Sequence, residues 1–180
     1  DAYLAHKRKG WTISDPKAFT DWFVGKVNSK AYGEQLRSVV KYLKAWRDYT
    51  GNTLKGIEIT ILATNAFNKY EGRDDKSLKA TVEQIISNLE NDFCCCKPVY
   101  PYEDLFDDAS DTRKDSILSG LKSLADNIGK AIDEKDEREA SKILRVKVFG
   151  NRFSLGKEAP KNLYAASAAP GVLKSDGRSA

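Results

Sequence analysis

Three cationic side chains occur along one predicted helix at a spacing that places them on a single face. In the stretch EQLRSVVKYLKAWRDY, residues 34–49, Arg37, Lys41 and Lys44 fall within roughly 60° of one another on a helical projection. Like charges this close repel by a few tenths of a kcal/mol per pair, and an anionic ligand would reverse that cost. Lysine ammonium groups and the forked arginine guanidinium both bind phosphate oxygens. This face therefore predicts triphosphate binding, with an ordinary solvated helix surface as the alternative.

Other titratable residues carry weaker signals. His6 is a single histidine in a cationic stretch that we expect to be a loop, where such a residue is usually inert. The three consecutive cysteines, Cys94 to Cys96, lack the spacing of a zinc site, so we expect buried thiols and no metal site. Acidic residues gather before a later helix, do not match an EF-hand loop, and are expected to serve the helix dipole. They are Glu103, Asp104, Asp107, Asp108 and Asp111.

Motifs of covalent or metal-assisted catalysis do not stand out in the sequence. We find no nucleophile with a neighbouring base, no glycine-rich phosphate loop and no HExxH element. A pair of carboxylates on a rigid strand, as metal-dependent phosphoryl transfer requires, is also not apparent. The sequence predicts no catalytic residues, and we expect the isolated chain to be inactive.

The composition is that of an ordinary globular protein. Charged residues make up 31% and hydrophobic residues 41% of 180 residues, and the formal charge is only +4. No apolar run approaches the ~20 residues of a membrane span, and the first residues lack the apolar core of a secretory signal. A cytoplasmic location follows as the expectation. Because the chain has no methionine and begins at Asp1, we interpret it as a fragment.

The elements that must position the cations are helical. The sequence Ser-Asp-Pro at 14–16 predicts a helix start, and the helix should run to about Lys26. Its aromatic residues should pack against the apolar side of the helix at 34–49, which Gly51 ends. The aromatic residues are Phe19, Trp22 and Phe23, and the apolar side consists of Leu36, Val39, Val40, Leu43 and Trp46.

Further helices are predicted downstream, with one ambiguous segment between. Residues 57–67 fit both strand alternation and a helix. Apolar stripes predict helices over about 78–93 and 117–132, and another helix at about 136–149 ends at Gly150. Two prolines interrupt the chain at 98–101. The fold class is therefore mainly α, a helical bundle over residues 1–155, followed by a flexible tail at 156–180 whose composition offers little to bury.

Four motifs in this order resemble a known family. They are LAHK, GW and SDP within residues 4–16, LRSVVKYLKAW at 36–46, PVYP followed by EDL at 98–105, and VFGNRF at 148–153. Together they resemble the C-terminal half of bacterial cGAS/DncV-like nucleotidyltransferases, the CD-NTases, over about residues 1–155. The resemblance implies the helical C-terminal lobe of a polymerase-β-like nucleotidyltransferase. It also favours a helix for 57–67.

The activity that the resemblance implies belongs to a two-lobed protein. CD-NTases join nucleoside triphosphates into cyclic di- or trinucleotide messengers that activate antiphage effectors in the CBASS defence systems. The catalytic acids and their Mg²⁺ ions belong to an N-terminal lobe that this sequence lacks. The expected partners are therefore that lobe and nucleoside triphosphates, and no membrane.

The resemblance also assigns roles to particular residues. Lys44 and Arg37 match residues that touch the donor triphosphate in related enzymes, and Lys41 shares their face. A serine that commonly contacts phosphate at the next helix start is missing from Leu54-Lys55-Gly56, so Lys55 or bare backbone N–H groups are expected to replace it.

Two further readings of the whole chain remain open. The same bundle could serve as a stand-alone nucleotide sensor. Alternatively, the chain could be an adaptor whose tail binds a ubiquitin-ligase-like CBASS protein, which would conjugate the final residue, Ala180, to a target. Plain disorder of the tail is the simpler alternative.

Overall fold

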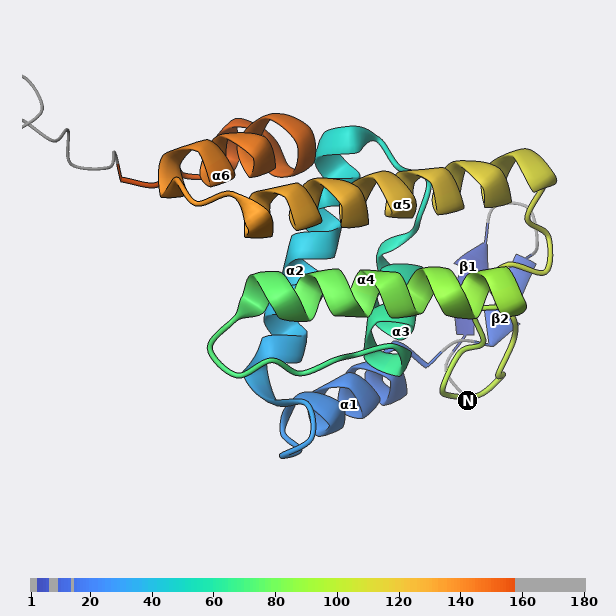
Figure 1. Cartoon of the computed structure of the whole chain (residues 1–180). Coiled ribbons are helices and arrows are strands. Elements are labelled where there is room, and N and C mark those ends of the chain that lie inside the picture. The colour runs from blue at the N-terminus through green and yellow to red at the C-terminus, as the bar shows by residue number, and fades with distance from the viewer. Residues whose placement is uncertain (1–2, 7–9, 14, 158–180) are drawn as a thin grey trace, which may run out of the picture.

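A computed structural model describes residues 3–6, 10–13 and 15–157 of the chain (Figure 1). In these ranges six α-helices follow a short hairpin. The strands are β1 (Tyr3–His6) and β2 (Gly10–Ile13). The helices are α1 (Pro16–Val27), α2 (Gly33–Thr50), α3 (Gly56–Asn65), α4 (Asp74–Asn91), α5 (Asp111–Asp133) and α6 (Glu137–Leu144). The prediction of a mainly helical bundle is confirmed.

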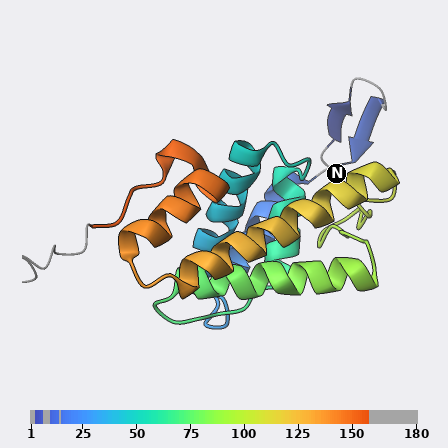
Figure 2. The same ribbon diagram turned by 45° about the horizontal axis from the view of Figure 1, so that its top comes forward.

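The hairpin was not predicted from the sequence. β1 and β2 pair antiparallel, with Tyr3 opposite Ile13 and His6 opposite Gly10. The expectation of a loop at His6 is therefore wrong, because His6 is the last residue of β1. The segments Tyr-Leu-Ala-His and Gly-Trp-Thr-Ile contain aromatic and β-branched residues that suit strands, a signal that the intervening cations obscured. The hairpin stands away from the helices beyond one end of α5 (Figure 2).

The first two helices begin and end as their sequence predicts. Asp15 Oδ1 accepts a hydrogen bond of 2.8 Å from the backbone N–H of Ala18, and Pro16 occupies the first turn of α1. α2 ends at Gly51, whose φ of 69° is the left-handed conformation that glycine adopts readily. The predicted apolar stripe of α2 is buried. The three aromatic residues of α1 pack against the core while remaining partly exposed.

The ambiguous segment is α3, so the strand alternative is wrong. Seven of its ten residues are buried, from Glu58 to Thr64. A helix enclosed on nearly all sides has apolar residues around its circumference, and its period cannot show in the sequence. Figure 1 shows α4 crossing in front of α2 and part of α3, and α5 crossing in front of α2.

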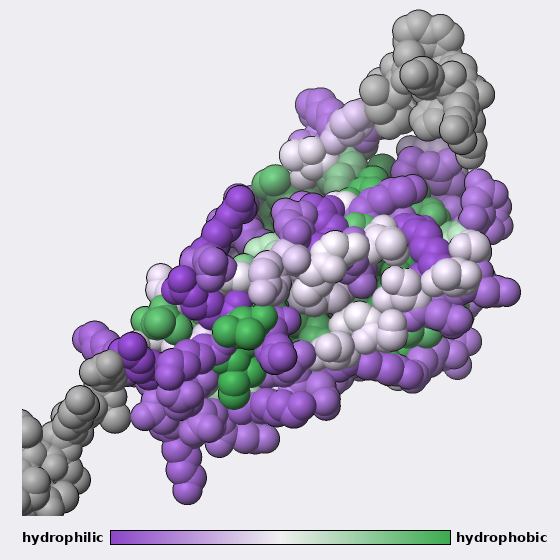
Figure 3. All heavy atoms as spheres, turned by 90° about the horizontal axis from the view of Figure 1, so that it is seen from above, coloured by the Kyte–Doolittle hydropathy of each residue, from purple (hydrophilic) through white to green (hydrophobic). Residues whose placement is uncertain are grey.

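The last elements close one end of the bundle. α6 is followed by a π-helical turn, Arg145–Phe149, and by Gly150, which has a φ of 73°. Tyr49 lies so close to Gly150 that a Cβ atom there would be 2.5 Å from Cδ2 of its ring. Viewed from the α5 and α6 side, the surface is mostly hydrophilic, with separate small apolar areas (Figure 3). None of the helices in the described ranges is both long and apolar enough to cross a membrane.

The backbone just past residue 155 contacts α6. The backbone N–H of Gly156 donates to Ser141 Oγ at 2.7 Å, and a Cβ atom on Gly156 would be 2.7 Å from the carbonyl oxygen of Glu137. The rest of the predicted tail, including Ala180, lies outside the described residues apart from Lys157.

Candidate functional site

A cavity of about 380 Å³ lies where four segments converge. The start of α1, the middle of α2, the start of α3 and the loop at 97–100 line it. Lys44 contributes a cation from α2 and Lys97 another from the loop, while Phe19 and Tyr100 supply aromatic walls. Gly56, the first residue of α3, forms part of the floor. The cavity therefore combines two cations and the carboxylate of Asp15 with apolar surface.

Lys44 is the predicted site residue that the structure places in this cavity. Its side chain is half-buried, and within the described ranges it has no carboxylate partner. Burial, and secondarily the positive charge of Arg47, lowers the pKa of Lys44. A Cβ atom on Gly56 would lie 3.8 Å from Cε of Lys44, so the lysine stem passes beside the first turn of α3. Partial burial without a partner makes the charged form of Lys44 less favourable, and a bound anion would offset that cost.

Arg37 and Lys41 lie earlier on α2 and are not among the residues that line this cavity. Lys41 is exposed. Arg37 Nε lies 3.1 Å from Glu34 Oε2, yet this buried atom makes no hydrogen bond, so the two side chains form a loosely aligned ion pair. The structure thus separates the predicted cation face into one cavity residue, Lys44, and two residues nearer the helix start. Their role in phosphate binding stays a prediction.

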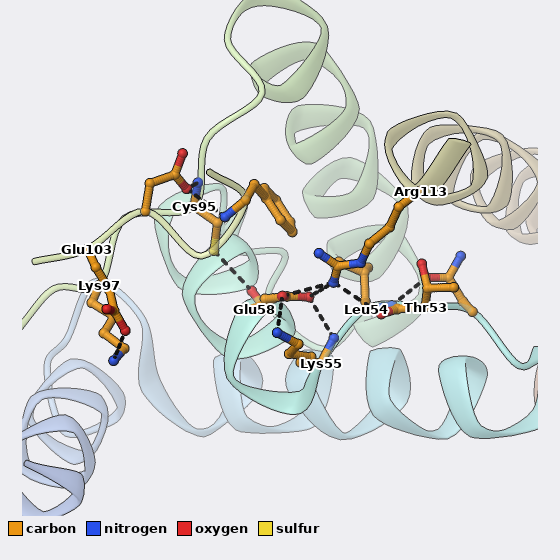
Figure 4. Close-up of polar contacts among 11 residues, drawn as sticks. Thr53, Leu54, Lys55, Glu58, Cys95, Lys97, Glu103 and Arg113 are labelled. Atoms are coloured by element: carbon orange, nitrogen blue, oxygen red, sulfur yellow. Dashed lines mark hydrogen bonds and ion pairs between the residues drawn. The ribbon is translucent and has the colours of Figure 1, made fainter. Parts of the chain in front are cut away.

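The first turn of α3 is held by a polar cluster that the sequence did not reveal (Figure 4). Glu58 is fully buried, and its Oε2 accepts a 2.7 Å hydrogen bond from the backbone N–H of Lys55. Arg113, from the start of α5, donates from Nη2 to both carboxylate oxygens at 2.8 and 2.9 Å. The same nitrogen donates to the carbonyl of Thr53 at 3.2 Å. No sequence pattern links Glu58 to a residue 55 positions later.

Lys55, the remaining predicted phosphate residue, is exposed at the start of α3. Its Nζ lies 3.8 Å from Glu58 Oε1, with 67% of the lysine side chain exposed. At that distance and exposure the ion pair is weak, and the ammonium group is free to turn toward a ligand.

The loop at 94–106 carries Lys97 to the cavity and is fixed by the acidic segment. Asp104 Oδ1 accepts hydrogen bonds from the backbone N–H groups of Cys95 at 2.7 Å and Phe106 at 3.0 Å. Glu103 forms an ion pair with Lys97. These two carboxylates therefore hold the loop, and within the described ranges no group of acidic, cysteine or histidine side chains is arranged to hold a metal ion.

The cysteines differ from one another more than the sequence suggests. Only Cys95 is buried, and its Sγ lies 3.9 Å from the carbonyl oxygen of Glu58. Cys94 is half-buried and Cys96 is exposed, so the expectation of buried thiols is wrong for Cys96. Successive side chains of an extended segment point to opposite sides, which explains the difference. Burial, with a hydrogen bond to Asp92, raises the pKa of Cys94 to about 11.

Two cavity-side cations escaped sequence analysis. Lys97 lines the cavity and directly precedes the motif at 98–101, but no pattern in the sequence assigned it a role. Arg47 follows Lys44 by one turn of α2, and its Nη1 would lie 3.6 Å from a Cβ atom on Gly56. Arg47 also pairs with Asp48 through Nη2 at 2.5 Å, whereas Lys44 has no carboxylate partner among the residues that the structure describes. The three-residue spacing between Lys44 and Arg47 could have indicated from the sequence that Arg47 lies near Lys44 on α2.

Comparison with known proteins gives a family match over most of the described helices. A family model described as "Cyclic GMP-AMP synthase, C-terminal domain" matches residues 33–158. A cyclic GMP-AMP synthase of Escherichia coli (strain TW11681) is 32% identical over 92 residues, which is 50% of this chain and 21% of that protein. The Vibrio cholerae cyclic GMP-AMP synthase is 28% identical over 157 residues, 80% of this chain and 34% of that protein.

Solved structures give the same result. Vibrio cholerae DncV in its 3′-deoxy GTP bound form superposes with a TM-score of 0.70 at 25% identity, covering 84% of this chain and 43% of that one. A Vibrio dinucleotide cyclase mutant gives a TM-score of 0.70 at 26% identity, with the same coverage. DncV has also been solved in complex with the linear intermediate pppA(3′,5′)pG, and its 24% identity to this chain supports the fold alone. The chain spans between a fifth and about two fifths of these relatives' lengths.

Proposed function

The chain belongs to the family of the cyclic GMP-AMP synthase C-terminal domain, and on that premise we propose that it serves as the helical lobe of a cyclic dinucleotide synthase. In this proposal the lobe contributes phosphate contacts to a nucleoside triphosphate held against an N-terminal nucleotidyltransferase lobe. The cyclic product would act as a second messenger in antiphage defence. A solved relative of 25% identity contains 3′-deoxy GTP, which supports this class of substrate.

The observation that carries the proposal is the position of Lys44. It is half-buried in the cavity, has no carboxylate partner within the described ranges, and runs beside the first turn of α3. A polyphosphate would supply the missing negative charge and would raise the lowered pKa of Lys44. Lys97 lines the same cavity, and the exposed Lys55 can approach the ligand from the start of α3.

We assign supporting roles to Arg37 and Lys41. Both lie on the side of α2 that carries Lys44, with Lys41 about one turn and Arg37 about two turns nearer the helix start. From there they attract the polyphosphate and help offset its charge during phosphoryl transfer. Since neither lines the cavity, we expect each to contribute less than Lys44.

Family enzymes use Mg²⁺ for this chemistry, and the described residues do not form a site for it. Asp104 is occupied by two backbone N–H groups and Glu103 by Lys97, and no other suitable group of side chains is present in the described ranges. We therefore place the Mg²⁺ ions, which neutralise the phosphates when bound, in the other lobe and derive no step through them here.

Replacing Lys44 in the full-length protein tests the proposal. We expect K44A to lower kcat/KM for product formation by about ten- to a hundredfold, as for loss of a charge-assisted hydrogen bond. K130A is the matched control, because Lys130 is exposed at the far end of α5 and pairs with Asp126. Unchanged turnover in K44A, with the mutant shown to be folded, would contradict the assignment.

The conjugation of Ala180 by a ubiquitin-ligase-like protein stays a prediction. That residue lies outside the described part of the chain. The anchoring of Gly156 to Ser141 does set where a tail deletion should begin, because removal of Gly156 itself would disturb α6. A deletion that tests the tail should therefore keep Lys157.

A further inference from the structure

The cavity has a buried negative charge directly behind its floor. Gly56 and Ile57 line the cavity, and Glu58 follows them with its side chain turned inward and fully buried. A carboxylate at this place would repel a bound phosphate through the poorly screened interior. Figure 4 shows what opposes it, since Arg113 reaches across from α5 to the Glu58 carboxylate.

Arg113 matches the Glu58 carboxylate in both charge and geometry. Its Nη2 contacts both Glu58 oxygens at 2.8 and 2.9 Å, and its side chain is only 21% exposed. The guanidinium carbon also lies 5.4 Å from the centre of the Phe106 ring, and Asp104 holds the backbone of Phe106. The arginine is thus fixed by α5 and by the loop that carries Lys97 to the cavity.

We propose that Glu58 and Arg113 form a positioning pair for the phosphate site: Arg113 neutralises the Glu58 carboxylate behind the cavity floor, while Glu58 holds the first turn of α3 beside Lys44. Neither residue touches the ligand. Glu58 acts through the backbone N–H of Lys55, and Arg113 acts through Glu58 and the carbonyl of Thr53. The inference rests on the proposed nucleotide function of the cavity.

A neutralising role and a merely structural role predict different changes in nucleotide affinity for the variants of this pair. If charge matters, R113M exposes the site to an unbalanced carboxylate and weakens nucleotide binding. E58Q keeps an acceptor for Lys55 and leaves Arg113 as an extra positive charge, so binding should be unchanged or tighter. E58Q/R113M has no charge at either position and should bind like the wild type. A structural role alone gives no reason for the double variant to bind more tightly than R113M.

The test is a binding cycle in the full-length protein with Mg²⁺ and nonhydrolysable analogues of ATP and GTP. Isothermal titration calorimetry should show the Kd of R113M raised about tenfold, the order expected of one unbalanced interior charge. E58Q/R113M should return to within about twofold of the wild type, because the two residues are coupled and neither charge remains. R73M is the control for loss of an arginine ion pair away from the cavity, because Arg73 pairs with Asp75 on the surface at the opposite end of α4 from the cavity loop.

The outcomes separate this inference from the proposed function. K44A measured in the same assay tests the proposed function, and an unchanged Kd there would refute it whatever the other variants do. If K44A weakens binding while R113M and E58Q/R113M match each other, the positioning pair is wrong and the phosphate site stands. Should R113M fail to fold, E58Q decides: an unchanged or lower Kd supports neutralisation, and a raised Kd overturns it.

Discussion

Two cations beside the first turn of α3 have opposite surroundings. Arg113 meets a fully buried carboxylate, Glu58, and donates hydrogen bonds to both of its oxygens. Lys44 is half-buried at the cavity, and its pKa is lowered by burial and by the charge of Arg47. The first arrangement satisfies its charges within the chain, and the second leaves a charge to be satisfied from outside. Burial of a cation alone therefore does not indicate a binding site, and it is the missing partner within the described ranges that leads us to propose one at Lys44.

The largest expected effect of this difference is on folding stability. R113M should lower the free energy of unfolding by about 3 to 5 kcal/mol, because it leaves the Glu58 carboxylate buried without its partner. E58Q/R113M should recover most of that loss, since no unpaired charge remains. Urea denaturation of the three proteins measures both values. A loss of stability in R113M that the double variant does not recover would mean that packing of the arginine stem, rather than its charge, stabilises the fold.

Removing the carboxylate of Asp15, which also has a hydrogen-bond partner within the chain, should have a smaller effect on stability. D15A removes the side chain that accepts a hydrogen bond from Ala18 at the start of α1, and should cost about 1 kcal/mol of stability. D15N keeps the acceptor and should lose less. Thermal unfolding followed by circular dichroism compares the two. Equal losses in both variants would show that the negative charge near the helix start, and not the cap, is the stabilising feature.

Local signals in the sequence predicted most of the helices and one residue of the site. Caps at Asp15 and Gly51 and the stripe of α2 depend on residues close in the chain, and the structure confirms them. α3 was ambiguous because a helix buried on nearly all sides has no polar face to reveal its period. The hairpin was missed because a run of cations separates its short strands.

The site depends on contacts that no local pattern encodes. Glu58 and Arg113 are 55 residues apart, and Lys97 and Lys44, which line the same cavity, are more than 50 residues apart. The helical projection could place Lys44 on the same face as Arg37 and Lys41, but it could not show which of them a loop would enclose. The motif at 98–101 marked the loop without revealing that its preceding lysine lines the cavity.

The smallest expected effect concerns the charge of Lys44, which has no carboxylate partner within the described ranges. Because the pKa of Lys44 is lower in the folded protein than its usual 10.5, protonated Lys44 costs stability at neutral pH. As the pH rises toward 10.5, the folded protein loses this proton before the unfolded chain does, so the cost disappears. K44M should therefore be more stable than the wild type at pH 7 by a few tenths of a kcal/mol, the scale of a partly exposed charge, and the difference should shrink by pH 10. Urea denaturation at pH 7 and pH 10 measures this stability difference, with K41M as the exposed-lysine control. If K44M is less stable than the wild type at pH 7, Lys44 already has a favourable partner within the chain.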